Sequence, residues 1–226
     1  MLVLSLDSSS IASAALTRNG EVLAEFATRD TRSHAEALAP AVYNLLGRAD
    51  VEPAQLKAIL VGTGPGPFTG LRAGLVSART FGFAWQLPVY GMCSLDALAH
   101  RAAQGAVGGT EFLVATDARR KELYWGRYIT HEDGHGRFAQ PLDGPQVTAP
   151  DQLPELPAYG YGAGLYTEQL PHVVTESAEW QPAAADLSRA AWALRECGIE
   201  LSADTAPLYL RESDAKVPVQ RKKALR

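Results

Sequence analysis

The sequence predicts an α/β protein of two domains, each a mixed sheet with helices on its faces, with the second domain reduced. Three observations lead to this fold class. A hairpin and a further strand come first, and helices and strands then alternate. A new run of strands begins after residue 110, and the aspartates at 7 and 117 occupy corresponding places in the two halves. A loop at 104–109 separates them, so the predicted domains are 1–106 and 107–226.

The first half starts with a hairpin and continues as a regular alternation of helices and strands. Asn19-Gly20 is a strong two-residue hairpin signal. Leu38 and Val42 begin an apolar helical stripe, in which Pro40 predicts a kink or a late start. Ser94 is a suitable N-cap for the last helix. The predicted segments are strands at 1–6, 11–17 and 21–27, a helix at 33–48, a strand at 58–61, a helix at 69–85, a strand at 87–92 and a helix at 94–104.

The second half begins in the same way but loses definition after its first strands. Its middle is rich in Pro and Gly, which weakens any prediction of regular structure there. Leu187 and Leu194 belong to the apolar stripe of a late helix. The predicted segments are strands at 112–116 and 122–130, a turn at 133–136, a short strand from 137, a hint of strand near 159–162 and a helix at 186–197.

A glycine-rich loop, residues 62–74, lies between a predicted strand and a predicted helix. Its glycines and prolines bend the backbone sharply, and Thr69 is placed to cap the following helix. Such a loop at a helix N-terminus presents free backbone N–H groups, which is the geometry that holds phosphate. The alternative interpretation is a rigid turn whose small residues allow close packing.

Residues 64–74 of this loop resemble the signature of the TsaB (YeaZ) family, a subunit of the bacterial machinery that makes threonylcarbamoyladenosine in tRNA. Pro67 stands where the family usually has Ser, which excludes a serine nucleophile in this loop. Further stretches resemble the family in the same order and cover nearly the whole chain: Asp7–Ser10, Ser33–Pro40, Ser94–Ala99, Asp117–Arg119 and Pro207–Arg211.

The order of elements matches the actin-like (ribonuclease H-like) superfamily of sugar kinases and Hsp70 ATPases, in which two such domains hold a nucleotide between them. The resemblance therefore implies a nucleotide site, working or vestigial. This chain lacks the glycine that active members have in the first turn, and the alternative is a polar turn organised by its aspartate. The positions implied for phosphate or nucleotide contacts are Asp7, Ser8, Ser9, Ser10, Gly64, Gly66 and Asp117. The chain itself is expected to require no cofactor, while ATP or ADP and Mg²⁺ can act within the complex.

The helix after the glycine loop carries small residues on more than one face, so it needs two packing partners. One partner is its own sheet. The resemblance implies that the other is a second subunit, and the alternative is a wholly internal helix. The predicted interface positions are His34, Leu38, Thr69, Gly70, Leu71, Arg72, Gly74, Leu75 and Ala78.

No metal site is predicted. Catalytic relatives bind metal through two histidines one helical turn apart, but Leu38 stands four residues after His34. His131-Glu-Asp-Gly-His135 fits the pattern of a zinc protease, which requires a helix, whereas this stretch favours a polar hairpin tip.

Charge disfavours an autonomous RNA-binding protein. The 226 residues carry a net charge of −4, all of it in residues 105–226. The basic end, Arg221 to Arg226, is expected to be a solvated tail, and the alternative is a tail that touches tRNA inside a complex. The start lacks the basic region of a signal peptide, and no apolar run is long enough for a membrane span, so a cytoplasmic protein is expected.

The function expected from the resemblance is that of a non-catalytic scaffold subunit without an active site of its own. Its partners would be the catalytic paralogue TsaD and the ATPase TsaE, with a homodimer when alone, tRNA contacted only through the complex, and no membrane. Two other classes stay open. One is an autonomous ATPase or small-molecule kinase that uses Asp7 and Asp117 around magnesium. The other is a metalloprotease built on residues 131–135.

Overall fold

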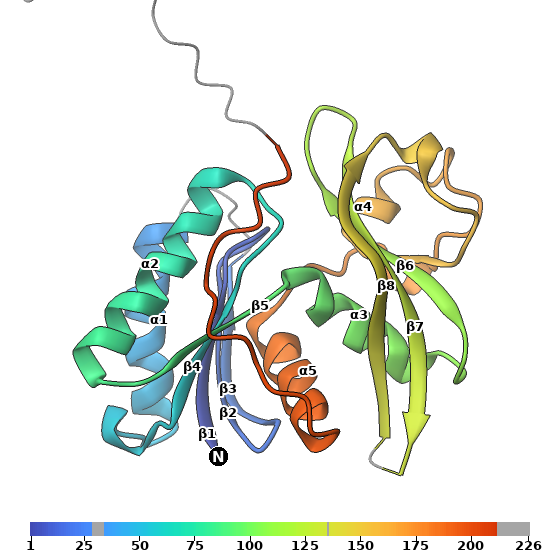
Figure 1. The fold of residues 1–226 in the computed structure, drawn as a ribbon. Coiled ribbons are helices and arrows are strands. Elements are labelled where there is room, and N and C mark those ends of the chain that lie inside the picture. The colour runs from blue at the N-terminus through green and yellow to red at the C-terminus, as the bar shows by residue number, and fades with distance from the viewer. Residues whose placement is uncertain (29–33, 135, 212–226) are drawn as a thin grey trace, which may run out of the picture.

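Two sheets with a pair of helices between them form the framework of the molecule (Figure 1). The computed structural model describes residues 1–28, 34–134 and 136–211. The layers follow one another as α1 with α2, the first sheet, α5 with α3, the second sheet, and α4 with its loops. In these described ranges no helix is long and apolar enough to cross a membrane.

The first sheet is mixed and has the strand order β3-β2-β1-β4-β5. β1 pairs antiparallel with β2 and parallel with β4, so the sheet combines a hairpin with a parallel half. Asn19 and Gly20 form the predicted hairpin turn, with φ of 52° and 80°. The strands are β1 (Leu2–Asp7), β2 (Ser13–Arg18), β3 (Glu21–Ala27), β4 (Ala58–Gly62) and β5 (Val89–Met92).

Helices α1 (His34–Arg48) and α2 (Phe68–Trp85) cover one face of the first sheet. The predicted stripe of α1 is buried there, and the helix runs through Pro40. Leu71 and Leu75 of α2 pack into the same core, against the leucines of β1. A short 3-10 turn, Pro53–Gln55, leads from α1 into β4.

The second sheet is smaller and has the order β8-β7-β6-β9. It repeats the antiparallel and parallel pairing of the first sheet with one strand fewer, which confirms a reduced second domain. The hint of strand near 159–162 holds only at its start, because the chain turns into a short helix there. The elements are β6 (Glu111–Asp117), β7 (Leu123–Asp133), β8 (Gly136–Thr148), β9 (Ala158–Tyr159), α4 (Tyr161–Gly164) and the 3-10 turns Pro150–Gln152 and Thr175–Ser177.

The two central helices are exchanged between the halves of the sequence. α3 (Ser94–Gly105) precedes the predicted boundary but packs on the second sheet, with Leu95 and Leu98 against Phe112. α5 (Ala184–Glu196) follows the boundary but covers the free face of the first sheet. The division at 106/107 stays a prediction, and it separates the strands of the two sheets but not their helices.

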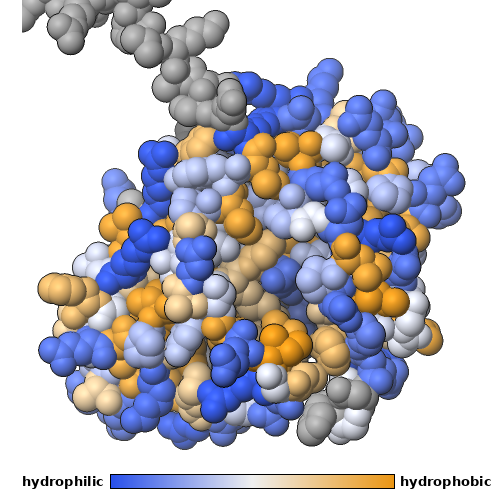
Figure 2. All heavy atoms as spheres, viewed as in Figure 1, coloured by the Kyte–Doolittle hydropathy of each residue, from blue (hydrophilic) through white to orange (hydrophobic). Residues whose placement is uncertain are grey.

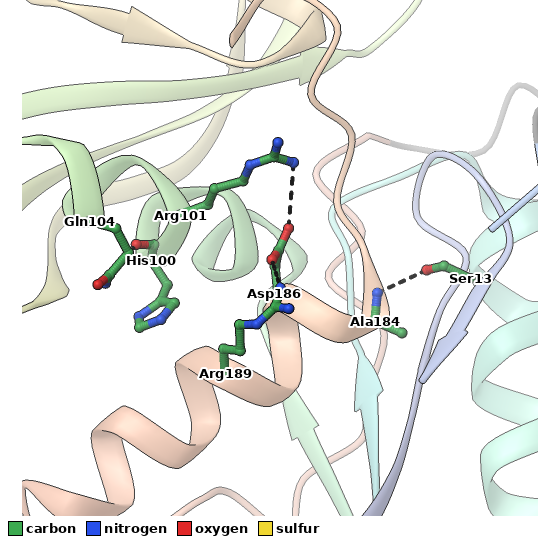
Figure 3. Close-up of polar contacts among 7 residues, drawn as sticks. All are labelled: Ser13, His100, Arg101, Gln104, Ala184, Asp186 and Arg189. Atoms are coloured by element: carbon green, nitrogen blue, oxygen red, sulfur yellow. Dashed lines mark hydrogen bonds and ion pairs between the residues drawn. The ribbon is translucent and has the colours of Figure 1, made fainter. Parts of the chain in front are cut away.

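Polar contacts connect these central helices to each other and to β2 (Figure 3). Asp186 in the first turn of α5 lies between Arg189, at 2.7 Å, and Arg101 of α3, at 3.7 Å. The guanidinium of Arg101 also lies 4.0 Å from the ring centroid of Trp180. The Ala184 amide donates to Ser13 Oγ at 3.0 Å, so a side chain of the first sheet satisfies the N-terminus of α5.

A C-terminal segment, residues 201–211, runs along the first domain and ends at the second. We call it the strap. The Gly91 amide donates to Ser202 O, and the Leu208 amide donates to Thr63 O. At its end, Arg211 donates to Ala118 O at 2.8 Å and forms an ion pair with Glu122. Figure 1 shows the strap in red, passing in front of β4 and β5.

Candidate functional site

The end of β1 and the glycine-rich loop after β4 meet at one edge of the first sheet, and Asp7 lies at their centre. Its carboxylate is fully buried and accepts hydrogen bonds from the Ser9 amide at 2.9 Å, Ser9 Oγ at 2.7 Å and Ser94 Oγ at 2.5 Å. The Gly64 amide in turn donates to Ser94 Oγ at 3.1 Å. Both carboxylate oxygens of Asp7 are therefore bound by groups of the chain itself.

Ser8 attaches the start of α2 to the same turn. Its hydroxyl donates to Gly70 O at 2.7 Å and accepts from the Gly74 amide at 2.9 Å. A hydroxyl that bonds two backbone groups of one helix fixes the position of that helix. Ser8 and Ser9, both predicted as phosphate donors, thus use their hydroxyls within the protein.

The glycines of the loop allow this close packing. A Cβ added at Gly62 would lie 1.7 Å from Asp7 Oδ2, and one at Gly66 would lie 2.4 Å from Ser9 O. Gly64 has φ of +94°, which residues with a side chain rarely adopt. These distances favour the interpretation of the loop as a rigid turn packed on the strand end, and its role as a phosphate cradle stays a prediction.

Both predicted helix caps are wrong. α2 begins after Pro67, without a side-chain cap, and Thr69 lies inside its first turn. α3 begins after Cys93, and Ser94 is already helical. The hydroxyl of Ser94 bonds Asp7 and the Gly64 amide, which are far away in the sequence, so a local pattern could not reveal its role.

The cleft between the domains has a volume of about 810 Å³ and lies beside this turn. Ser9, Ser10 and Pro67 line it from the first domain, and Asp117 and Arg119 line it from the second. The Asp117 carboxylate accepts from the Arg119 amide at 2.7 Å and pairs with its guanidinium at 3.2 Å. The structure thus brings Asp117 and two of the predicted serines to one cleft, but it buries Asp7 behind them. Gln181 and Glu179 complete the lining, and no sequence signal pointed to them.

In the described part of the chain, no three His, Cys, Asp or Glu residues are grouped to hold a metal. Leu38 is fully buried, while the side chain of His34 and the whole of His135 lie outside the described residues. His131 lies in strand β7 and stacks on Phe138, so the stretch is a hairpin arm and lacks the helix that a zinc protease requires.

The predicted interface positions separate into buried and exposed residues. Thr69 and Arg72 are exposed on α2. The other described side chains and glycines of that set are buried inside the first domain: Leu38, Gly70, Leu71, Gly74, Leu75 and Ala78. The interface itself stays a prediction.

The outer face of α1 and α2 presents other residues instead. Phe83 is 89% exposed, and Val76 and Tyr43 are each 61% exposed. Tyr43 meets the rings of Phe81 and Trp85 edge-on, at 6.1 and 6.5 Å. Val76 and Phe83 are seven residues apart, so they share one face of α2. That spacing was visible in the sequence, but the small residues drew attention to the opposite face.

A buried polar pair links α3 to the second sheet. Tyr128 of β7 donates its hydroxyl to Asp96 Oδ1 at 2.9 Å. Burial raises the pKa of Asp96 to about 6, although the hydrogen bond from Tyr128 lowers it. Burial, with the charge of Asp96, also raises the pKa of Tyr128 well above its ordinary value. Both groups are best accommodated as neutral partners below pH 6.

Comparison with known proteins places these features in a family. The family model described as "TsaD: tRNA N6-adenosine threonylcarbamoyltransferase" matches residues 21–180. An uncharacterized protein of Mycobacterium tuberculosis is 41% identical over 196 residues, covering 86% of this chain and 83% of the relative. The tRNA threonylcarbamoyladenosine biosynthesis protein TsaB of Escherichia coli is 30% identical over 229 residues, covering 95% and 96%.

The comparison with solved structures supports the same family. YeaZ from Pseudomonas aeruginosa superposes with a TM-score of 0.75 at 30% identity, covering 92% of this chain and 99% of that one. The two mixed sheets and the turn at Asp7 define a two-domain actin-like protein. Within that class, the chain belongs to the TsaB (YeaZ) family.

Proposed function

We propose that this chain is the non-catalytic subunit of the cytoplasmic complex that transfers a threonylcarbamoyl group to the adenosine next to the anticodon in tRNA. The observation that carries the proposal is the similarity to Escherichia coli TsaB over nearly the full length of both chains. The catalytic paralogue TsaD and the ATPase TsaE are its proposed partners, and a homodimer forms when it is alone. Contact with tRNA occurs only within the complex.

The state of Asp7 supports a structural rather than a catalytic role. In the actin-like superfamily the equivalent aspartate holds a metal or the reacting water, for which its carboxylate must face the cleft. Here three donors of the chain bond the carboxylate, and none of the residue is exposed. Freeing it would break hydrogen bonds to a buried charge, and these are among the stronger ones in proteins.

The outer face of α1 and α2 is the proposed contact with the partner subunit. Large hydrophobic residues on a surface helix expose apolar area to water, which is unfavourable. A partner that covers them removes this free-energy cost. Phe83, Val76 and Tyr43 supply that area, while the buried small residues of α2 hold the helix close to its own sheet.

The test is a reconstitution from purified components, with ATP, bicarbonate, threonine and unmodified tRNA, and with or without this chain. Modified adenosine is measured by mass spectrometry. We expect product only when the chain is present, and none when it is paired with the adenylate-forming enzyme alone. Equal product with and without the chain contradicts the proposal.

The inter-domain cleft favours a second candidate, a nucleotide-binding protein of the same superfamily. Its volume of about 810 Å³ and its polar lining, which includes Gln181, Asp117 and Arg119, suit a nucleotide. We propose that ATP or ADP with Mg²⁺ binds there within the complex but is not required by the chain itself. Titration calorimetry with Mg·ADP measures binding. ATP turnover by the isolated chain that Asp7→Ala abolishes would make this the primary function.

A further inference from the structure

The turn between β6 and β7 holds three consecutive basic residues in an unfavourable backbone conformation. Arg119, Arg120 and Lys121 have φ of 62°, 55° and 61°, and all three are exposed. Left-handed backbone crowds the Cβ atom of any residue other than glycine. A strained conformation persists only where the surroundings impose it, and such positions concentrate at binding sites. Long cationic side chains at three such positions point to a ligand rather than to turn formation.

Local hydrogen bonds impose this conformation. The Ala118 amide donates to Glu122 O, and the Glu122 amide donates to Arg119 O, both at 3.0 Å. The Arg119 amide donates to the Asp117 carboxylate at 2.7 Å. The turn is therefore a fixed platform, and its three side chains start from fixed positions.

Further arginines extend this charge along the strap. Thr205 of the strap accepts from Arg79, and the Tyr209 hydroxyl accepts from Arg72 at 2.8 Å. The strap then ends at Arg211, against the turn itself. We call these residues the cationic row: Arg79, Arg72, Arg211, Arg119, Arg120 and Lys121. Residues 205–211 of an extended chain span about 20 Å, which sets the length of the row.

The arginines of the row on α2 are held in place. The guanidinium of Arg72 lies 5.6 Å from the ring centroids of both Phe68 and Tyr209, and those two rings are 4.5 Å apart. A side chain fixed in this way loses little conformational freedom when it binds an anion.

Acidic groups among the described residues lie beside the row. Asp117 pairs with Arg119, and Glu122 pairs with Arg211. Asp204 accepts a hydrogen bond from the Ala206 amide within the strap. Glu179 also lines the cleft with Arg119, so six basic and four acidic residues gather here in the described part of a chain whose net charge is −4. Figure 2 shows hydrophilic residues along the upper edge of the molecule, where Figure 1 places the β6–β7 turn.

The sequence beyond Arg211 has a net positive charge. Residues 212–226 contain five Lys or Arg and two Asp or Glu.

We propose that the cationic row is the surface with which this chain binds the phosphate backbone of the tRNA substrate. The inference rests on the proposed function and adds to it a role and a location. A row of about 20 Å spans several phosphates of one strand. Arginine and lysine contacts to phosphates position a nucleic acid without reading its sequence, so the row orients tRNA while the catalytic subunit selects the adenosine.

The first test is binding of the assembled complex to an unmodified tRNA transcript, measured by fluorescence anisotropy over a series of KCl concentrations. The variant replaces all three turn residues: Arg119→Gln, Arg120→Gln and Lys121→Gln. We expect the Kd to rise about 10- to 100-fold near 100 mM salt, and the slope of log K against log salt to become less steep by about 2 to 3.

A matched control removes the same charge from the end of the first domain that lies away from Asp7: Arg18→Gln, Arg48→Gln and Lys57→Gln, all exposed. We expect its Kd and salt slope to stay within twofold of wild type. A charge-preserving variant, Arg119→Lys, Arg120→Lys and Lys121→Arg, restores most of the affinity. Identical losses in the turn and control variants overturn the proposal, because they report net charge alone.

Lys121→Gly separates strain from binding. Glycine adopts the left-handed conformation freely, so we expect the Tm of the chain to rise by about 2–4 °C while the affinity for tRNA falls. A turn that serves only the fold predicts a higher Tm with unchanged affinity, and that result overturns the inference.

Reconstituted modification distinguishes this inference from the proposed function. If wild-type chain is needed for product, and the turn variant raises the KM for tRNA at unchanged kcat, both stand. If wild type is needed but the turn variant has a normal KM, only the inference fails. If the turn variant no longer assembles with its partners in native mass spectrometry, the row binds protein and the tRNA proposal is wrong.

Discussion

Ser94 donates a 2.5 Å hydrogen bond to the buried carboxylate of Asp7, and so attaches the first turn of α3 to the end of β1 across 87 positions of the chain. The same hydroxyl accepts from the Gly64 amide. One side chain therefore joins the strand end, the glycine-rich loop and the helix that begins the crossing to the second domain.

Ser94→Ala should destabilise the protein, because it removes one partner of a buried carboxylate and one partner of a buried amide. We expect the free energy of unfolding in urea to fall by about 1–3 kcal/mol. Thr80→Ala, on the exposed face of α2, is the control and should change it by no more than about 0.5 kcal/mol. Equal effects of the two substitutions would show that the bond to Asp7 contributes little.

Gly62→Ala should be more damaging. The new methyl group would overlap Asp7 Oδ2, and neither backbone is free to move away. We expect a loss of at least about 2 kcal/mol, seen as a lower Tm. Gly47→Ala in α1 is the matched control, because a Cβ there meets nothing within 4 Å. Its expected effect has the opposite sign, a gain of about 0.5–1 kcal/mol.

Asp96 should make stability depend on pH. Its pKa is about 6 in the folded chain and near 4 when unfolded, so the folded state holds the proton more tightly. Stability therefore falls as pH rises from about 4 through 6. Asp96→Asn removes this dependence. Relative to wild type, we expect the variant to gain about 2 kcal/mol between pH 4.5 and pH 7.5 in urea unfolding. A constant difference across that range would refute the assignment.

Phe83→Asp should prevent subunit association without unfolding the chain. The side chain is 89% exposed, so the charge costs little in the free protein but is buried without a partner in an interface. We expect native mass spectrometry to show loss of the homodimer and of the pair with the catalytic paralogue. Leu142→Asp, at a 45% exposed position on β8, is the control and should assemble normally. Unimpaired assembly of Phe83→Asp would move the interface elsewhere.

The sequence predicted most of the fold, because periodicity and turn chemistry act locally. The hairpin at Asn19-Gly20, most of the strands and the long helices follow the predicted ranges closely. β8 is an exception, with 13 residues where only a short strand was predicted. The same patterns say that a helix has an apolar face but not which sheet that face covers. The positions of α3 and α5 were therefore out of reach, as were the contacts across the cleft.

The candidate site was predicted in outline only. Asp7 and Asp117 do end corresponding strands, but the sequence could not distinguish a carboxylate facing a cleft from one bonded by Ser94. Small residues on α2 indicated close packing, and this packing is internal. Phe83 and Val76 are the stronger sign of an outer contact, since both are large, apolar and exposed on one face of α2.

The exchange of α3 and α5 bears on how this protein can be taken apart. A fragment ending at residue 106 would keep α3 without the sheet it covers, and its own sheet would lose α5. The complementary fragment would have the reverse defect. Each fragment exposes apolar surface that the other fragment covers in the intact protein. The two halves are therefore suited to a split-protein reporter: separately insoluble, and restored to a native fold when produced together.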